Sequence, residues 1–283
     1  MPAVLGTNVA SLWASKNLQS AQTNMAYSVE RLSSGLRINR ARDDAAGLGI
    51  ANALTMQINS ADQGIRNLND GISIVQTAEG ALVQVGEMAQ RILALSVQGQ
   101  SSALTTTQKN SITTEMRALL DGINAIQTRT KFGSNTNSIF NATALTVNSG
   151  KDSSDTVTIT ATSLSTIGTT AGLALTLSTN VTTAASTATV GDFQAITSSV
   201  TTYIDAISSQ RGALGATQNQ MDYSISNITE LSANLTSARS RITDTDYASE
   251  TAKLTKGQIL QQAATAMLAQ ANQMPNVILS LLK

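Results

Sequence analysis

A heptad repeat of apolar residues, running from about Ala45 to Val97, constrains the fold more than any other feature of the sequence. Such a repeat is typical of a helix that packs lengthwise against other helices. At about 1.5 Å per residue the helix would be roughly 75 Å long, which predicts a rod rather than a globule for a chain of 283 residues. The first heptad position holds Leu54, Ala61, Leu68, Val75, Leu82 and Ala89, and the second holds Ile58, Ile65, Ile72, Gly86 and Leu93, with Glu79 as the one charged intrusion.

Further apolar repeats predict four more helices. One begins at Thr106 or Thr107 and ends near Thr130, and another carries a heptad repeat from Ile207 to Ile242. The residues just before two of the helices, 43–44 and 243–246, include Asp and Thr side chains suited to capping a helix start. The helices at the two chain ends carry an apolar seam, called the terminal seam below. Its residues are Leu18, Met25 and Leu32 near the N-terminus, and Leu260, Ala264, Met267, Ala271, Met274, Ile278 and Leu281 near the C-terminus.

Between Gly133 and about Asp192 the sequence becomes rich in Ser and Thr and poor in charge. Apolar and polar residues alternate over 156–160 and again over 173–177, a pattern typical of strands. The sequence therefore predicts a mainly α-helical, elongated rod of long coiled-coil-like helices formed by both chain ends, with a small β-hairpin insert. The order of helices mirrors itself around this insert, so the two halves of the terminal seam can reach each other.

The chain contains no His and no Cys, which removes the commonest general base and the thiolate nucleophile. Zinc sites, disulfides and Ser-His-Asp or Cys-His catalytic groups are excluded with them. The 18 basic side chains balance the 18 acidic ones, so no net field favours nucleic acid or an anionic membrane. No apolar run is long enough for membrane insertion, and no cleavable secretory signal is visible. We predict a protein that is not an enzyme and binds no cofactor or metal.

Three short motifs have simpler explanations than a catalytic site. The segment Gly47–Gly49 resembles part of a nucleotide loop, but it lacks the preceding strand and the third glycine. The neighbouring carboxylates Asp43 and Asp44 lie at a helix start, where capping and ion pairing account for them. Asp244 and Asp246 resemble the start of a calcium loop whose glycine and distal Glu are absent.

Segments near both ends of the chain resemble the signatures of bacterial flagellins. The N-terminal ones are Leu32–Asn39 and Asp43–Leu48, and the C-terminal ones are Ser240–Ile242, Asp246–Ala252 and Ile259–Gln273. The resemblance covers about residues 1–135 and 195–283. It implies a structural subunit that polymerises into the flagellar filament for swimming, secreted through the flagellar type III export channel.

The same resemblance implies the domain organisation and the partners. Residues 1–43 and 244–283 would form a terminal coiled-coil domain that lines the filament core. Residues 44–243 would form a rod domain of long helices with a variable insert at about 135–192. The expected partners are further copies of the chain in a helical homopolymer, a flagellar export chaperone, and the cap and hook-associated proteins.

Two alternative functions stay open at the level of sequence. A hook–filament junction protein of the same export system shares similar terminal helices. A secreted flagellin-like adhesin would bind polysaccharide through the insert, although residues 141–190 contain no aromatic side chain to form a sugar groove.

The stretch Gln90–Gln98 resembles the segment by which the vertebrate Toll-like flagellin receptor detects many flagellins. The resemblance implies that Arg91, Leu95 and Glu115 contact the receptor. We expect Arg91 and Leu95 to be exposed on one helix face, off the core, and Glu115 to lie on the neighbouring helix. The alternative is that Arg91 and Glu115 form only a surface ion pair. One departure from the family pattern is Trp13, which we expect either to fill a gap in the core or to lie between subunits.

Overall fold

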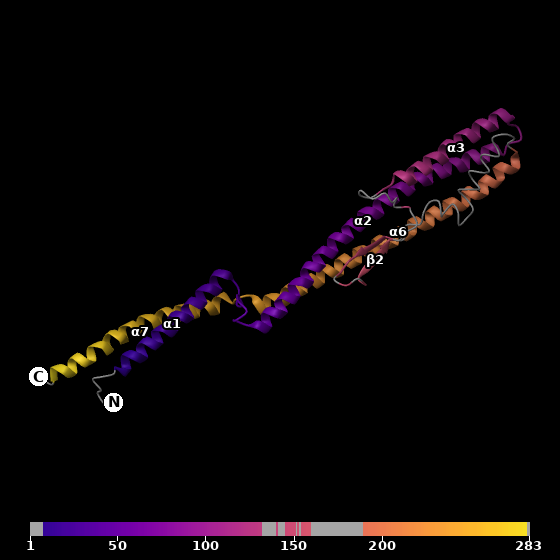
Figure 1. Ribbon diagram of the computed structural model, residues 1–283. Helices are drawn as coiled ribbons and strands as arrows, with labels where there is room; N and C mark the ends of the chain where they lie inside the picture. Colours follow the sequence, from indigo (N-terminus) through magenta and orange to yellow (C-terminus); the bar gives the residue numbers. More distant parts are fainter. Residues whose placement is uncertain are drawn as a thin grey trace. The chain divides into compact units, whose positions relative to one another are not determined.

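The protein is mainly α-helical, with one small two-stranded sheet (Figure 1). The computed structural model describes residues 8–131, 140, 145–150, 152, 154–159 and 189–281, with side chains described up to residue 273. The helices and strands are α1 (Val9–Ser34), α2 (Ala45–Gly99), α3 (Thr106–Arg129), β1 (Leu145–Asn148), β2 (Thr156–Ile159), α6 (Val190–Thr243) and α7 (Tyr247–Leu281). The predicted mainly helical class and the predicted hairpin are confirmed, while the alternating leucines of 173–177 lie outside the described residues.

Side-chain caps set where the helices begin. The Asp44 carboxylate accepts a hydrogen bond from the Gly47 backbone N–H at 2.8 Å, and the Asp246 carboxylate accepts one from the Ala248 N–H at 3.0 Å. Helix α3 begins with a capping box in which the side chains of Thr105 and Gln108 each bond the backbone of the other residue. These bonds satisfy amide groups that the first turn of a helix leaves without a partner. The predicted starts of α2, α3 and α7 are thereby explained.

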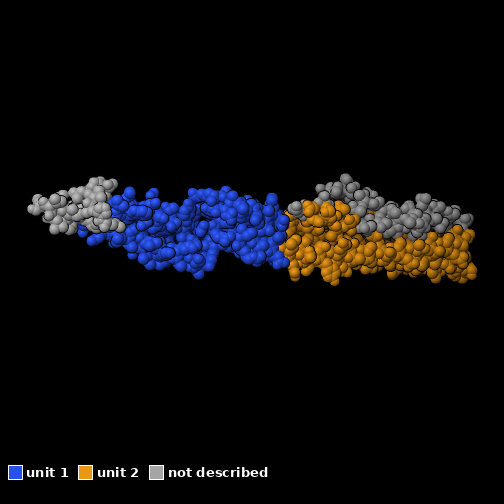
Figure 2. All heavy atoms as spheres, turned by 90° about the horizontal axis from the view of Figure 1, so that it is seen from below, with its two compact units in different colours: residues 1–58, 233–283 blue, residues 59–232 orange. Residues whose placement is uncertain are grey.

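The chain folds into two compact units, coloured separately in Figure 2. Unit 1 comprises Met1–Ile58 and Ala233–Lys283, and unit 2 comprises Asn59–Ser232. The division falls inside helices α2 and α6, whereas the domain boundaries expected from the sequence lie at the breaks between helices.

In unit 1, helices α1 and α7 lie side by side and run antiparallel (Figure 1). Helix α1 ends at Gly35, whose φ of 71° is the left-handed conformation that glycine adopts most readily. Its carbonyl accepts the Thr245 N–H at 2.9 Å, and the next residue, Leu36, forms an isolated antiparallel bridge with Asp244. This bridge ties the end of α1 to the start of α7.

Unit 2 has a core built from α3, the hairpin and the parts of α2 and α6 that belong to this unit. The first heptad position predicted for α2 is buried from Ala61 to Ala89, whereas the second predicted position is buried only at Ile58. Ile65, Ile72, Gly86 and Leu93 are only half-buried. The buried positions lie one residue earlier, at Gly64, Gly71, Ala78, Val85, Ile92 and Gly99.

The small residues at these positions let neighbouring elements approach the α2 backbone. A Cβ atom on Gly99 would lie 2.3 Å from the Phe193 ring of α6, and one on Gly64 would lie 2.1 Å from the Ser149 carbonyl oxygen. Real Cβ atoms essentially never come so close, so a larger residue at either position would displace the Phe193 ring or the Ser149 backbone. The packed face of α2 therefore combines large apolar residues, such as Leu68 and Leu82, with small residues where another element approaches the backbone.

The hairpin is part of the core of unit 2. Strands β1 and β2 pair antiparallel in the register Leu145 opposite Ile159 and Val147 opposite Val157. Val147, Val157 and Ile159 are buried, and they belong to the same apolar cluster as Leu68 and Met221. The insert therefore begins with a segment that the core requires.

Candidate assembly surface

The seam between α1 and α7 is made of small residues. Its fully buried positions are Ala14, Ala21 and Ser28 on α1, and Glu250, Gly257 and Ala271 on α7. A Cβ atom on Gly257 would lie 3.5 Å from the Met25 Cβ, which is ordinary van der Waals contact. The two helices are thus close along their length, and little apolar area is available to hold them together.

The residues expected to form the terminal seam differ in burial between α1 and α7. Leu18, Met25 and Leu32 are half-buried beside the small residues of α1, Ala264 is half-buried and Ala271 is buried. Leu260 and Met267, by contrast, are 48% and 63% exposed. The half-buried leucines of α7 are instead Leu254 and Leu268, so Leu260 and Met267 lie on a more exposed face of the helix. The side chains of Met274, Ile278 and Leu281 lie outside the described residues.

A buried polar cluster fixes the seam near the start of α7. Ser28 donates a hydrogen bond to the Glu250 carboxylate at 2.7 Å, and Lys253 donates another at 2.9 Å, while Arg31 Nη1 lies 3.9 Å from that carboxylate. Glu250 is only 4% exposed. Burial acts to raise its pKa, but the hydrogen bonds from Lys253 and Ser28 and the charges of Lys253 and Arg31 prevail, so the pKa is lowered. Glu250 is therefore held as a carboxylate inside the helix pair.

Large apolar side chains are exposed on the outer faces of both terminal helices. On α1, Val9, Leu12 and Trp13 are 55%, 70% and 60% exposed. On α7, Ile259 is 61% exposed, and it lies beside the exposed Leu260 in the sequence. We call these exposed residues, together with Met267, the outer apolar surface. A run of exposed apolar side chains on a helix pair indicates a surface that another molecule covers.

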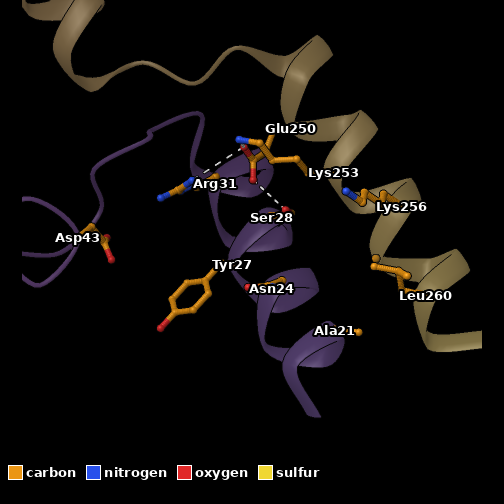
Figure 3. Close-up of a pocket in the computed structure, with 11 residues that line it drawn as sticks. Ala21, Asn24, Tyr27, Ser28, Arg31, Asp43, Glu250, Lys253, Lys256 and Leu260 are labelled. Atoms are coloured by element: carbon orange, nitrogen blue, oxygen red, sulfur yellow. Dashed lines mark hydrogen bonds and ion pairs between the residues drawn. The ribbon is translucent and has the colours of Figure 1, made fainter. Parts of the chain in front are cut away.

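A cavity of about 490 Å³ opens beside the buried cluster, between α1 and α7 (Figure 3). Tyr27 and Asn24 of α1 lie on one side of it, and Lys256 and Leu260 of α7 lie on the other. The remaining lining residues are Ala21, Ser28, Arg31, Asp43, Glu250, Lys253 and Gly257. No sequence pattern predicts this hollow, because it results from the spacing of two helices that are distant in the sequence.

The residues expected to contact a receptor lie in unit 2. Arg91 and Glu115 bridge α2 and α3 through hydrogen bonds of 2.9 and 2.7 Å, and both side chains are about half exposed. Leu95 is only 2% exposed, so the prediction that it is an exposed contact is wrong. It belongs to the packed core because α2 contacts two helices in this unit and buries a wider face than one heptad seam.

Within the described part of the chain, no three acidic side chains gather closely enough to hold a metal ion. No described helix is long and apolar enough to cross a membrane. The described side chains that gather between α1 and α7 bury an ion cluster and expose apolar groups, an arrangement suited to association.

Two family models match this chain. The model of the bacterial flagellin N-terminal helical region matches residues 5–145, and that of the bacterial flagellin C-terminal helical region matches residues 197–282. The match to the N-terminal model ends at the start of β1, and the match to the C-terminal model begins within α6. The stretch between them includes β2 and the Ser- and Thr-rich segment.

Relatives match over the full length of the chain. A flagellin of Halalkalibacterium halodurans is 37% identical, with 99% of this chain and 100% of that protein covered. Flagellin B of Vibrio anguillarum is 34% identical over an alignment 378 positions long, gaps included, which covers 98% of this chain and 99% of that one. Among solved structures, one described as a flagellar hook-associated protein of Vibrio parahaemolyticus has a TM-score of 0.60 at 12% identity, covering 71% of this chain and 100% of the other. That likeness shows the fold alone.

Membership of a family follows from the two models and from identities above 30% along the whole chain. Proteins of this family self-polymerise into the flagellar filament outside the cell and associate there with hook-associated proteins. The chain belongs to the bacterial flagellin family, and it is a structural subunit of the flagellar filament.

Proposed function

We propose that subunits assemble through the outer apolar surface of α1 and α7, with residues 1–43 and 244–283 lining the filament core and residues 44–243 forming the rod domain. The observation that carries this proposal is the exposure of large apolar side chains on paired helices. Trp13, Leu12 and Met267 are each at least 60% exposed. Covering such side chains contributes about 25 cal/mol per Å² of apolar area removed from water. The terminal helices therefore gain stability from neighbouring copies that their own seam does not supply.

Charge substitution on the outer apolar surface tests this proposal. Met267→Asp should block polymerisation, because assembly would bury a carboxylate that has no partner. The matched control is Ser249→Asp, at an exposed position near the start of the same helix, where no residue three or four positions away belongs to the outer apolar surface. Sedimentation and electron microscopy measure filament formation, and circular dichroism measures helix content. Normal filaments from Met267→Asp would exclude this surface from the lattice.

The alternative of a hook–filament junction protein has less support. The relatives that match the whole chain are flagellins, whereas the hook-associated structure shares only the fold at 12% identity. A catalytic role is also without support, since the family is a structural one and the chain lacks His and Cys.

Three further partners are proposed from the family resemblance. An export chaperone and the cap protein would bind the terminal helices before and during assembly. A vertebrate Toll-like receptor would contact Arg91 and Glu115, whose exposure supports that role, without Leu95. Pull-down of each purified partner with the full chain tests these contacts one by one.

A further inference from the structure

The cavity between α1 and α7 is a hole that no side chain of the described residues fills. Its floor contains Ala21 and Gly257, which are too small to reach across it. Its walls include the Leu260 side chain and the Tyr27 ring, which are 48% and 37% exposed. A volume of about 490 Å³ lies within the range of roughly 300–1,000 Å³ that is typical of pockets for small organic groups.

The lining favours an aromatic guest. Lys256 lines the cavity, and no hydrogen bond or ion pair to its ammonium group is found among the described residues. The lining is mixed, with polar and charged residues beside the apolar Ala21, Gly257 and Leu260. A cation next to such apolar surface attracts the face of an aromatic ring, most strongly that of an indole. The side-chain carbonyl of Asn24 can accept the indole N–H, which is a donor only. The Glu250 carboxylate is already bonded to Ser28 and Lys253, so it does not require a cationic guest.

The chain offers one such ring. Trp13 is the only tryptophan of the chain, and its side chain is 60% exposed on α1. The neighbouring Leu12 is 70% exposed, and the Lys16 ammonium of the same chain lies 5.4 Å from the centroid of the Trp13 ring. Trp13 precedes Ala21 by eight residues of the same helix, about 12 Å, so it does not reach the cavity of its own chain. Only another copy can bring the ring to the cavity.

We propose that Trp13 of one copy inserts into the cavity between α1 and α7 of a neighbouring copy, where Lys256 lies against the ring and Leu260 packs on its edge. This inference rests on the proposed assembly through the terminal helices. The ring and the cavity are different patches of the same chain, so a head-to-tail arrangement of copies leaves each added copy with one free ring or one free cavity. Such a contact extends an open polymer.

The first test is the critical concentration for polymerisation of the full chain. Trp13→Ala should raise it at least about tenfold, whereas Trp13→Phe should raise it less than about threefold, because the smaller ring keeps much of the contact. Lys256→Met keeps the side-chain stem and should raise it about threefold or more by removing the cation. Lys16→Met, which changes only the contact within one chain, is the control and should have no effect. An unchanged critical concentration for Trp13→Ala would overturn the inference.

The second test exploits the absence of cysteine from the chain. Asn17 lies one helical turn after Trp13 on the same face, so Asn17→Cys chains copolymerised with Lys256→Cys chains should form disulfide-linked dimers on oxidation. Asn17→Cys with Thr255→Cys, and each single variant alone, give the background. Filaments that form normally but show only background cross-linking would refute the insertion of Trp13 while leaving the proposed function intact. Failure of the wild-type chain to polymerise would instead refute the proposed function.

Discussion

Glu250 shows how one side chain can make a helix pair sensitive to acid. Its carboxylate is buried at the seam and bonded from both helices, by Ser28 of α1 and Lys253 of α7. The charges around it are Arg31 on α1, Lys253 and Lys256 on α7, and Asp43 on the loop, with Tyr27 also facing the adjoining cavity. Because the folded-state pKa is lowered from the ordinary 4.5, the charged form stabilises the pair above that value.

We therefore predict that the α1–α7 pair weakens as the pH falls below 4.5 and through the lowered pKa of Glu250. Filaments of Glu250→Gln should lose less thermal stability than wild-type filaments between about pH 6 and about pH 3, although they start from a lower value. Differential scanning calorimetry at each pH gives the comparison. Glu30→Gln, which removes a partly exposed ion pair with Arg40 in the same unit, serves as the control for the loss of a carboxylate. Parallel pH profiles for wild type and Glu250→Gln would show that another carboxyl group governs the acid response.

The Arg91–Glu115 pair leads to a different prediction at the same scale. Both side chains are about half exposed, so the pair should contribute less than about 1 kcal/mol to the stability of unit 2. Arg91→Asp should therefore change the free energy of unfolding little while abolishing activation of the Toll-like receptor by monomeric protein. Urea unfolding and a receptor reporter assay measure the two effects. Activation equal to that of wild type would remove Arg91 from the proposed contact.

At the scale of single elements, the helices could be predicted from the sequence far better than the faces they bury. Long heptad repeats indicate α2 and α6, and capping residues indicate where α3 and α7 begin. The apolar pattern predicts the wrong buried residue at positions where a large apolar residue lies close to a small one in the sequence. The pattern predicts Leu260 in the seam, but Gly257 is the buried residue there, and it predicts Ile65 on the buried face of α2, where Gly64 is buried instead. Size is a poor guide to burial when two helices approach closely, because only glycine, alanine and serine then fit between the backbones.

Two glycines of α2 give matched substitutions. Gly64→Ala should destabilise unit 2 or displace the hairpin, because the added Cβ would lie 2.1 Å from the Ser149 carbonyl oxygen. Gly80 has no described atom within 4 Å of such a Cβ, so Gly80→Ala should stabilise the helix by about 0.5–1 kcal/mol. Thermal unfolding of the two variants measures both effects. Equal shifts in Tm for Gly64→Ala and Gly80→Ala would mean that the turn of the hairpin does not pack closely against α2.

Two deletions in the insert should differ sharply in their effect on the stability of unit 2, according to where each deletion begins. Removing residues 161–187 spares both strands, so unit 2 should keep its stability and filaments should still form. Removing 147–187 also takes away Val147, Val157 and Ile159 from the core, each worth roughly 1 kcal/mol or more. Denaturant unfolding and electron microscopy compare the two. Equal stability of both deletions would show that the hairpin is dispensable to the core.

At the scale of the whole molecule, the two units differ in how they are stabilised. Unit 2 has large, fully buried side chains such as Leu82, Met116, Phe193 and Leu214. In the described seam of unit 1 between α1 and α7, the buried positions hold alanine, glycine and serine around one carboxylate, and the leucine and methionine side chains are only half-buried. The sequence could predict that both groups of helices exist. It could not predict the cavity of unit 1 or the docking of the hairpin on α2, because both depend on contacts between residues that no periodic pattern connects.

This difference predicts an order of unfolding in the monomer. Unit 1 should unfold at lower urea concentration than unit 2, because it buries less apolar area. The single tryptophan, Trp13, belongs to unit 1, so the polarisation of its fluorescence reports that unit alone, while circular dichroism reports all the helices. The fluorescence transition should come first. Coincident transitions would indicate that the two units unfold together.

The anchoring of the hairpin has an evolutionary consequence. Ile159 at the end of β2 and Phe193 near the start of α6 are both fully buried in the core of unit 2. Selection for a stable fold acts on these two positions, and changes in the sequence between them need not alter the packing of either one. The alignment of 378 positions with the Vibrio anguillarum relative shows that such proteins differ in length. A lineage under attack by antibodies or phage could thus renew this stretch many times while the packing it inherited stays the same.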